Sequence, residues 1–251
     1  MHNLPQSWNE VSIEQLIELK KLELNESLGI ISMHIEKYCI LANIEQDDEE
    51  LENVDIDTLL AEISKLHFLN FLPINPPVKI KEYSLMNISK ISLGEYIDIC
   101  SFIENDFYDN IPKILAILYK HTKVDEWGNV IYEPYIYNLF ERSIELENVS
   151  AEAYGAISKF IEFKEKVIES YKGIFNLETD DELSDDEREG LEEDEIININ
   201  KEIMIEKQKK VFAWPFFVYN LAGEDIVKMK DVYSLPLIFC LNVVQMKQTI
   251  K

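Results

Sequence analysis

Glycine and proline are scarce in this chain, at 7 and 8 of its 251 residues. β-Sandwiches, β-barrels and Rossmann-type folds need many tight turns, which glycine and proline form most readily. Hydrophobic residues make up 47% of the sequence, which is ample material for a core. The sequence therefore predicts a mainly α-helical globular body whose helices are joined by polar loops.

The formal net charge of −24 is concentrated in two short stretches. The stretch from Glu178 to Glu195 holds 12 acids and one arginine, and the stretch from Glu45 to Asp57 holds 8 acids and no base. Together they carry −19 of the total, so the remaining chain is nearly balanced. Two acidic loops are predicted, either solvated and extended by self-repulsion or in contact with a basic partner, for instance by mimicking nucleic-acid charge.

A calcium loop fits the second stretch poorly. The best EF-hand register begins at Asp185 and places Ile196 at the twelfth position, where a bidentate acid is required. The same charge would repel phosphates, and 22 of the 24 basic residues are lysines rather than arginines, which nucleic-acid sites favour. We therefore expect neither a metal site nor direct contact with DNA or RNA.

Helix boundaries can be read from capping residues and from apolar spacing. Ser12 with Gln15 and Ser92 with Glu95 fit capping boxes, in which two side chains satisfy the free amides of a first turn. Pro112 suits the first turn of a further helix. Helices are expected over about 13–24, 27–43, 58–69, 93–103, 110–119, 134–146, 151–175, 199–211, 224–231 and 235–248.

One region alternates apolar and polar residues as a strand does. It runs from Val78 to Leu85, and Met86-Asn87 can turn the chain toward Ile88–Ile91. A small β-hairpin is predicted over about 78–91. The residues from Asp125 to Asn129 are predicted to form a separate turn.

The acidic stretch near residue 180 suggests the domain boundary. We expect a helical body with its hairpin over 1–177, an acidic linker over 178–198 and a C-terminal helical segment over 199–251. The last segment is short for an independent core, so it is expected to dock on the body.

The residues that usually carry chemistry are too dispersed to form a site. No two glycines are close enough for a phosphate loop, and the histidines lack zinc-ligand spacing. His34 and Cys39 lie five residues apart on one helix and so point about 140° apart. Three cysteines lie singly in apolar segments, as reduced core thiols do: Cys39, Cys100 and Cys240. No catalytic residue, cofactor or metal is predicted, and the chain is not expected to be an enzyme.

An aromatic cluster over 212–219 is the candidate contact surface. Its members are Trp214, Phe216, Phe217 and Tyr219. Such a cluster forms either part of a core or the centre of a protein interface. Base stacking is disfavoured, because the neighbouring acidic stretch outweighs the lysines that precede the cluster.

Targeting signals are not evident. There is no apolar run of about 18 residues, and the first residues lack a basic stretch followed by an apolar one. Neither a membrane span nor a signal peptide is expected.

Three stretches resemble segments of tailed-bacteriophage proteins. Leu4-Pro5-Gln6-Ser7-Trp8-Asn9-Glu10-Val11-Ser12 resembles a Leu-Pro-x-Ser-Trp-x-x-Val-Ser/Thr opening. Gly94-Glu95-Tyr96-Ile97-Asp98-Ile99, followed by Ile114-Leu115-Ala116-Ile117-Leu118-Tyr119, resembles a Gly-x-Tyr-Ile-Asp-Leu … Ile-Leu-Ala-Ile-Leu-Tyr pattern, although Lys120 stands where arginine is common. Leu221-Ala222-Gly223-Glu224-Asp225-Ile226 resembles a Leu-Ala-Gly-x-Asp-Ile segment.

Those proteins include tail-assembly chaperones and virion components of crAss-like and related phages. The resemblance implies a non-enzymatic virion component, in the tail region or as packaged cargo, found in the virion and in the host cytoplasm during assembly. Its partners would be other phage structural proteins or further copies of itself. A tail-assembly chaperone and an acidic inhibitor that mimics nucleic acid are the alternatives.

Overall fold

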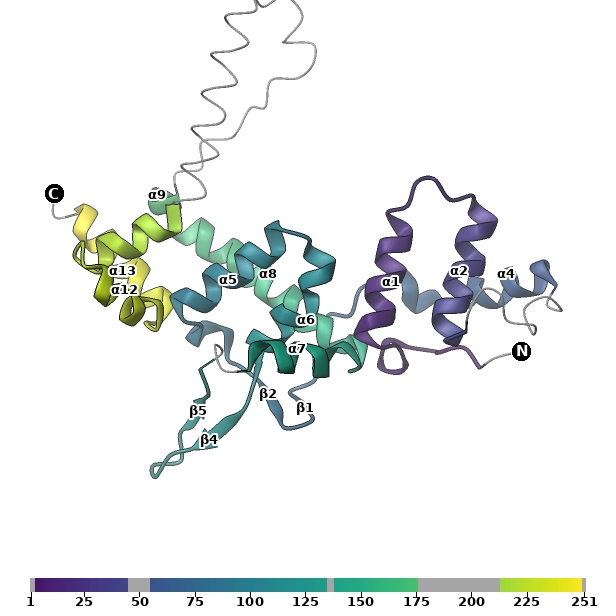
Figure 1. Ribbon diagram of the computed structural model, residues 1–251, viewed down its shortest axis with the longest axis horizontal. Helices are drawn as coiled ribbons and strands as arrows, with labels where there is room; N and C mark the ends of the chain where they lie inside the picture. The colour runs from purple at the N-terminus through teal and green to yellow at the C-terminus, as the bar shows by residue number, and fades with distance from the viewer. Residues whose placement is uncertain (1–2, 45–54, 135–137, 176–212, 250–251) are drawn as a thin grey trace, which may run out of the picture. The chain divides into compact units, whose positions relative to one another are not determined.

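The computed structural model describes residues 3–44, 55–134, 138–175 and 213–249. By its internal contacts the chain divides into two compact units, residues 1–88 with 98–164 and residues 89–97 with 165–251. The division falls inside two helices, α5 (Leu93–Glu104) and α8 (Gly155–Ser170). Both units are mainly α-helical, as the composition predicts (Figure 1). The predicted linker 178–198 and helix 199–211 lie outside the described residues.

Helix α6 forms the centre of the first unit. Its second half, from Ile114 to Leu118, has no exposed surface, because it packs against α7, α1 and the short 3-10 helix η4. On the far side of α1 lie α2 and then α4. Besides residues 98–104 of α5 and 155–164 of α8, this unit holds α1 (Ile13–Glu23), α2 (Ile30–Ala42), α4 (Ile56–Ser64), α6 (Phe107–Leu118) and α7 (Leu139–Glu147), with 3-10 helices η1 (Trp8–Glu10), η2 (His67–Asn70) and η4 (Ala151–Tyr154).

The predicted hairpin over 78–91 is confirmed only in its first half. Strand β1 (Lys79–Ile80) pairs antiparallel with β2 (Tyr83–Leu85), but Ile88–Lys90 is a 3-10 turn and not a strand. The outer partner of β2 is instead β3 (Tyr119–Lys120), which continues directly from the end of α6. The sequence prediction failed here because this pairing joins segments far apart in the chain.

A second hairpin was not predicted. Strand β4 (Thr122–Val124) pairs with β5 (Val130–Tyr132) around the turn that the sequence does predict at Asp125–Asn129. The hairpin extends away from the helices of the first unit (Figure 1).

Several predicted helix ends are also corrected. Helix α4 begins at Ile56, because the Asp55 carboxylate accepts a hydrogen bond from the Thr58 amide at 3.2 Å, so the end of the first acidic stretch caps a helix. Residues 45–54 of that stretch lie outside the described residues. Pro112 lies inside α6, which begins at Phe107, and not in a first turn. The predicted helix 151–175 is three elements: η4, α8 and α9 (Lys172–Phe175).

Both predicted capping boxes form. Beside each cap serine the backbone also pairs antiparallel with a segment far away in the sequence, and we call such a pairing a backbone clip. Ser12 and Gln15 exchange side-chain and backbone hydrogen bonds at 3.0 Å. The residues beside Ser12 pair with the residues beside Ser150: the Ile13 amide donates to the Val149 carbonyl and the Ala151 amide to the Val11 carbonyl. This clip fixes the start of α1 against the segment that leads into α8.

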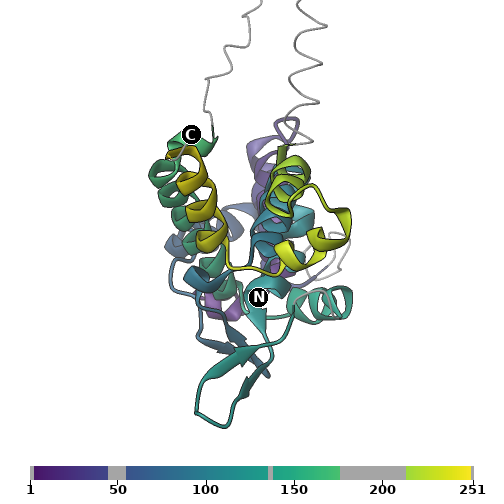
Figure 2. The ribbon, with the colours of Figure 1, turned by 90° about the vertical axis from the view of Figure 1, so that its left-hand side faces the viewer.

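The second unit repeats this clip around Ser92 and Glu95. The Ser92 amide donates to the Glu95 carboxylate at 2.9 Å, and the flanking residues bond to the backbone at Leu235 and Leu237. The remaining helices of this unit are residues 213–221, α12 (Ile226–Tyr233) and α13 (Leu237–Thr249), which packs on α9 (Figure 2, yellow).

The three cysteines are buried and unbridged, as predicted for core thiols. Cys39 lies on α2, Cys100 on α5 and Cys240 on α13. Burial also raises the pKa of the Cys240 thiol. A raised pKa keeps a thiol protonated and unreactive at neutral pH.

Candidate functional site

The predicted aromatic cluster is helical, and part of it faces inward. Trp214 packs edge-to-face on Tyr96, with ring centroids 5.7 Å apart, and on Phe217 at 5.5 Å. Such pairs stabilise packing through favourable ring geometry as well as burial. Trp214 and Phe217 therefore take part in the internal packing of the second unit.

The other two members differ in accessibility. Phe216 is 63% exposed, whereas Tyr219 is half-buried. Of the four residues that the sequence singles out as a contact surface, Phe216 is the one whose side chain is strongly exposed.

The β4–β5 hairpin exposes more apolar surface than its length suggests. Trp127 at its turn is 83% exposed and Val124 is 69% exposed, and Val130 and Ile131 are also exposed. Val124 pairs with Val130 and Lys123 with Ile131, so the apolar side chains lie on both faces of the ribbon. Neither face is covered over most of the hairpin's length.

The turn that carries Trp127 is tightly hydrogen-bonded. The Asp125 carboxylate accepts from the amides of Trp127 and Asn129 at 2.9 and 2.7 Å and from the Asn129 side chain at 2.9 Å. Gly128 takes a φ of +84°, which suits glycine. These bonds, led by that from the Asn129 side chain, lower the pKa of Asp125, so its charge persists at neutral pH. The backbone at Trp127 is therefore held in place before any partner binds.

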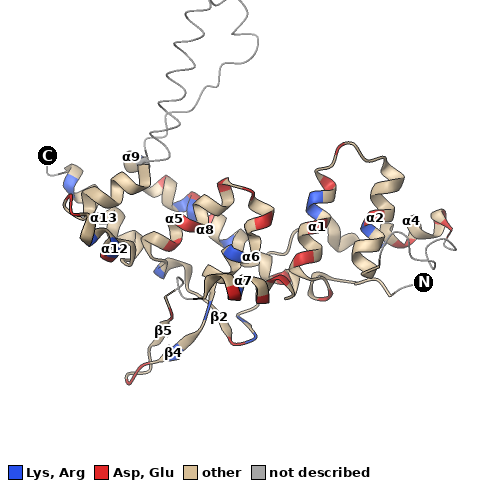
Figure 3. Cartoon of the chain, viewed as in Figure 1, with Lys and Arg blue, Asp and Glu red and all other residues tan. Residues whose placement is uncertain are grey.

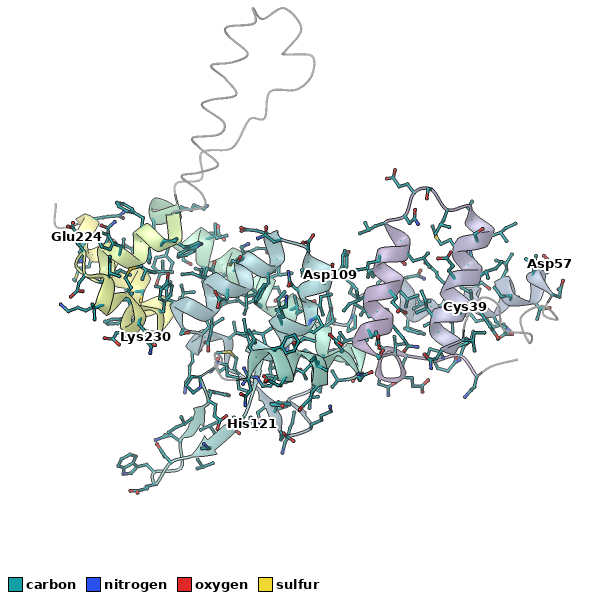
Figure 4. The ribbon with its side chains drawn as sticks, in the orientation of Figure 1. Cys39, Asp57, Asp109, His121, Glu224 and Lys230 are labelled. Atoms are coloured by element: carbon teal, nitrogen blue, oxygen red, sulfur yellow. The ribbon has the colours of Figure 1, made fainter. Side chains whose placement is uncertain are left out.

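The base of the hairpin is fastened to the first unit. The Asn87 amide donates to the Tyr132 hydroxyl at 3.3 Å, and the Glu133 amide donates to the His121 carbonyl at 3.0 Å. Figure 4 places His121 at this base, where its ring packs on Tyr83 in a tilted arrangement with centroids 4.6 Å apart. The hairpin is thus anchored at one end and projects from there.

A polar contact between β2 and α7 lies near this base. The Tyr83 hydroxyl donates to Glu145 on α7 at 2.7 Å, and Arg142 on the same helix is buried. Burial, followed by the hydrogen bond to Glu145, raises the pKa of Tyr83 to about 12. Its phenol therefore stays protonated and acts as a hydrogen-bond donor that ties β2 to α7, a structural role.

A second apolar surface is formed by residues 71–78, whose backbone is fixed at several points. The Trp8 indole donates to the Phe71 carbonyl at 2.7 Å, and the Tyr119 hydroxyl donates to the Pro77 carbonyl at 2.8 Å. Gly155 lies so close that an added Cβ would be 2.8 Å from the Pro76 nitrogen. The side chains of Phe71, Ile74 and Val78 nevertheless point into solvent.

A shallow groove follows α1 and α2. Its volume is about 770 Å³, and its lining includes the buried Leu22 and Cys39, the latter labelled in Figure 4. Lys21 in the lining forms an ion pair with Asp109. Because the groove combines apolar, acidic and basic side chains without a converging set of donors, its geometry does not define a reaction.

Within the described ranges, no three histidine, cysteine, aspartate or glutamate side chains gather as metal ligands would. Nor does any helix in those ranges combine the length and apolar character needed to cross a bilayer.

Comparison with known proteins finds no matching family model, curated protein or solved structure. The site must therefore be interpreted from its own geometry, and the β4–β5 hairpin is the projecting element on which Trp127, Val124 and Ile131 are exposed together. The sequence reasoning missed it, although Val130-Ile131-Tyr132 are three good strand formers that follow directly on the predicted turn.

Proposed function

We propose that this chain is a non-enzymatic bacteriophage virion component that acts through protein–protein contacts, in the tail region or as packaged cargo. The single observation that supports contact formation best is the β4–β5 hairpin, which exposes Val124, Trp127 and Ile131 on a projecting ribbon. Large exposed apolar side chains gathered on one element mark interaction sites more often than scattered ones do.

Binding to a partner would stabilise the hairpin. A lone two-stranded ribbon is at best marginally stable in water, and this one has only three residues in each strand. Covering its faces would remove apolar side chains from water and stabilise the pairing. A contact role explains why such side chains stand on this ribbon and not in the core.

The phage setting rests on the three stretches that resemble tailed-phage proteins. In the structure these stretches have structural roles: Trp8 is buried, Ser92 and Glu95 cap α5, and Asp225 caps α12. These roles concern folding, so the phage setting is supported by the sequence resemblance alone. The proposal of a virion component combines this resemblance with the exposed hairpin.

Quantitative mass spectrometry of purified particles tests the proposal. A virion component is expected at a fixed number of copies per particle after density-gradient purification and nuclease treatment. The control is a phage protein that is expressed strongly but does not enter particles. Absence of this chain from particles, despite abundant expression in infected cells, would contradict a virion component and favour the tail-assembly chaperone.

A further inference from the structure

The tip of the β4–β5 hairpin combines a large apolar side chain with negative charge. Asp125 and Glu126 directly precede Trp127, and the structure places all three on the same turn. Figure 3 shows acidic residues at this end of the hairpin. The indole supplies apolar contact area, and the carboxylates set the sign of the local field.

The charges farther along the hairpin cancel one another. Lys123 and Glu133 form an ion pair at 2.9 Å, and Lys123 is the one lysine or arginine in the hairpin sequence from 121 to 133. The net charge near Trp127 therefore comes from Asp125 and Glu126. Three hydrogen bonds to the Asp125 carboxylate favour its charged form and lower its pKa.

The backbone of the tip is fixed before binding. The Asp125 amide bonds to the Asn129 carbonyl at 3.0 Å, and the Gly128 amide bonds to the Asp125 carbonyl at 3.1 Å. An ordered turn loses little backbone freedom when it docks, so more of the contact energy appears as affinity. Tryptophan is also among the residues that dominate interface energetics when it enters a fully desolvated pocket.

We infer that the β4–β5 hairpin docks Trp127 into an apolar pocket of another protein whose rim is positively charged. This inference rests on the proposed contact function and specifies the partner's chemistry. The positive charge of the partner's rim is inferred from charge complementarity, because basic side chains would be attracted to the acids beside Trp127. A second copy of this chain is the alternative occupant, and the crosslinking experiment below would reveal it. Nucleic acids and anionic lipid surfaces would present the wrong sign.

A set of β-cyclodextrins with amino, neutral and sulfoalkyl rims tests the tip directly. Their apolar cavities are alike and accept an indole, so only the charge of the rim differs. Binding to the purified full-length protein is followed by tryptophan fluorescence. Trp127→Phe identifies the contribution of Trp127, because Trp8 is buried and Trp214 is half-buried.

The cationic host is expected to bind more tightly than the neutral host by about two- to fivefold for each acid engaged. The anionic host should bind most weakly, and the preference should shrink as salt is added. Glu126→Gln should reduce the preference. The matched control Glu26→Gln removes one exposed charge in the α1–α2 loop and should leave it unchanged. Equal binding of all three hosts, or equal effects of the two substitutions, would overturn the inference.

Photocrosslinking in infected cells tests the same inference on the natural partner. A benzophenone amino acid replaces Trp127, and the crosslinked peptides are identified by mass spectrometry. Crosslinks to a different protein, at apolar positions beside lysine or arginine, support the inference. Crosslinks to this chain itself, or to acidic surfaces, overturn it. Because the cyclodextrin assay uses the isolated protein, its failure is distinguishable from absence of the chain from virions.

Discussion

Replacing Gly155 with alanine should push residues 74–76 away from the start of α8, against which they pack. Gly155 begins α8 with φ −56° and ψ −22°, so its backbone can accept alanine without strain. The added Cβ would, however, lie 2.8 Å from the Pro76 nitrogen and 2.9 Å from both the Ile74 carbonyl carbon and Pro76 Cδ. Two of these three atoms belong to the backbone, so a side-chain rotation cannot relieve the contact.

The expected magnitude follows from two opposing effects. Overpacking of this kind costs about 1–3 kcal/mol. Alanine recovers roughly 0.5–1 kcal/mol, because glycine is a poor helix former. Gly155→Ala should therefore lower the free energy of unfolding by about 0.5–2 kcal/mol, and each kcal/mol lowers Tm by about 2–4 °C for a chain of this size.

Thermal and urea denaturation measure this loss, with Gly173→Ala as the control. No atom lies within 4 Å of a Cβ added at Gly173, so that variant should match or slightly exceed the wild type. Hydrogen exchange at the Leu85 amide, which bonds to the Val78 carbonyl at 2.8 Å, should accelerate in Gly155→Ala alone. A Gly155→Ala protein as stable as the Gly173→Ala protein would refute the close contact.

Three further changes have defined outcomes. Ser12→Ala removes the cap of α1 and should reduce the free energy of unfolding by about 1 kcal/mol in urea titrations; no change would show that the capping box adds nothing to stability. Tyr83 has a folded pKa of about 12, above its usual value of 10.0, so its stabilising contribution should be intact below pH 10 and lost as the pH rises toward 12. Tyr83→Phe should show a shallower alkaline loss in unfolding measurements from neutral pH to about pH 11.5; an unchanged slope would contradict the buried phenol. The three cysteines, buried in the native state, should react with a thiol reagent such as Ellman's only slowly until denaturant is added, and rapid native labelling would contradict their burial.

The sequence predicts local structure here better than long-range pairing. Ser12 with Gln15 and Ser92 with Glu95 predict helix starts correctly, because all the bonding groups lie within one turn. Strand β3 could not be predicted in this way: Tyr119 and Lys120 follow a strongly apolar helix and pair with β2, more than thirty residues earlier. That pairing depends on the fold as a whole.

The candidate site was predicted less well, because it depends on which aromatic side chains the fold buries and which it leaves exposed. The sequence singles out Trp214 for a partner contact and places Trp127 only in a turn, but Trp214 packs on Tyr96 and Trp127 remains exposed. Three-residue strands are also too short to give a reliable alternating pattern. The predicted turn at Asp125–Asn129 located the tip, but not the strands on either side of it.

The clip of the second unit has a consequence for how the chain is made. Residues near Ser92 leave the ribosome long before Leu235 and Leu237, on the order of 10 s earlier at usual elongation rates. During that interval the amide of Leu93 and the carbonyl of Ile91 lack their native partners. In the nascent chain these two groups therefore wait for the later segment, which alone supplies their partners. A ribosome that stalls before residue 235 leaves this unit unable to form its native pairing.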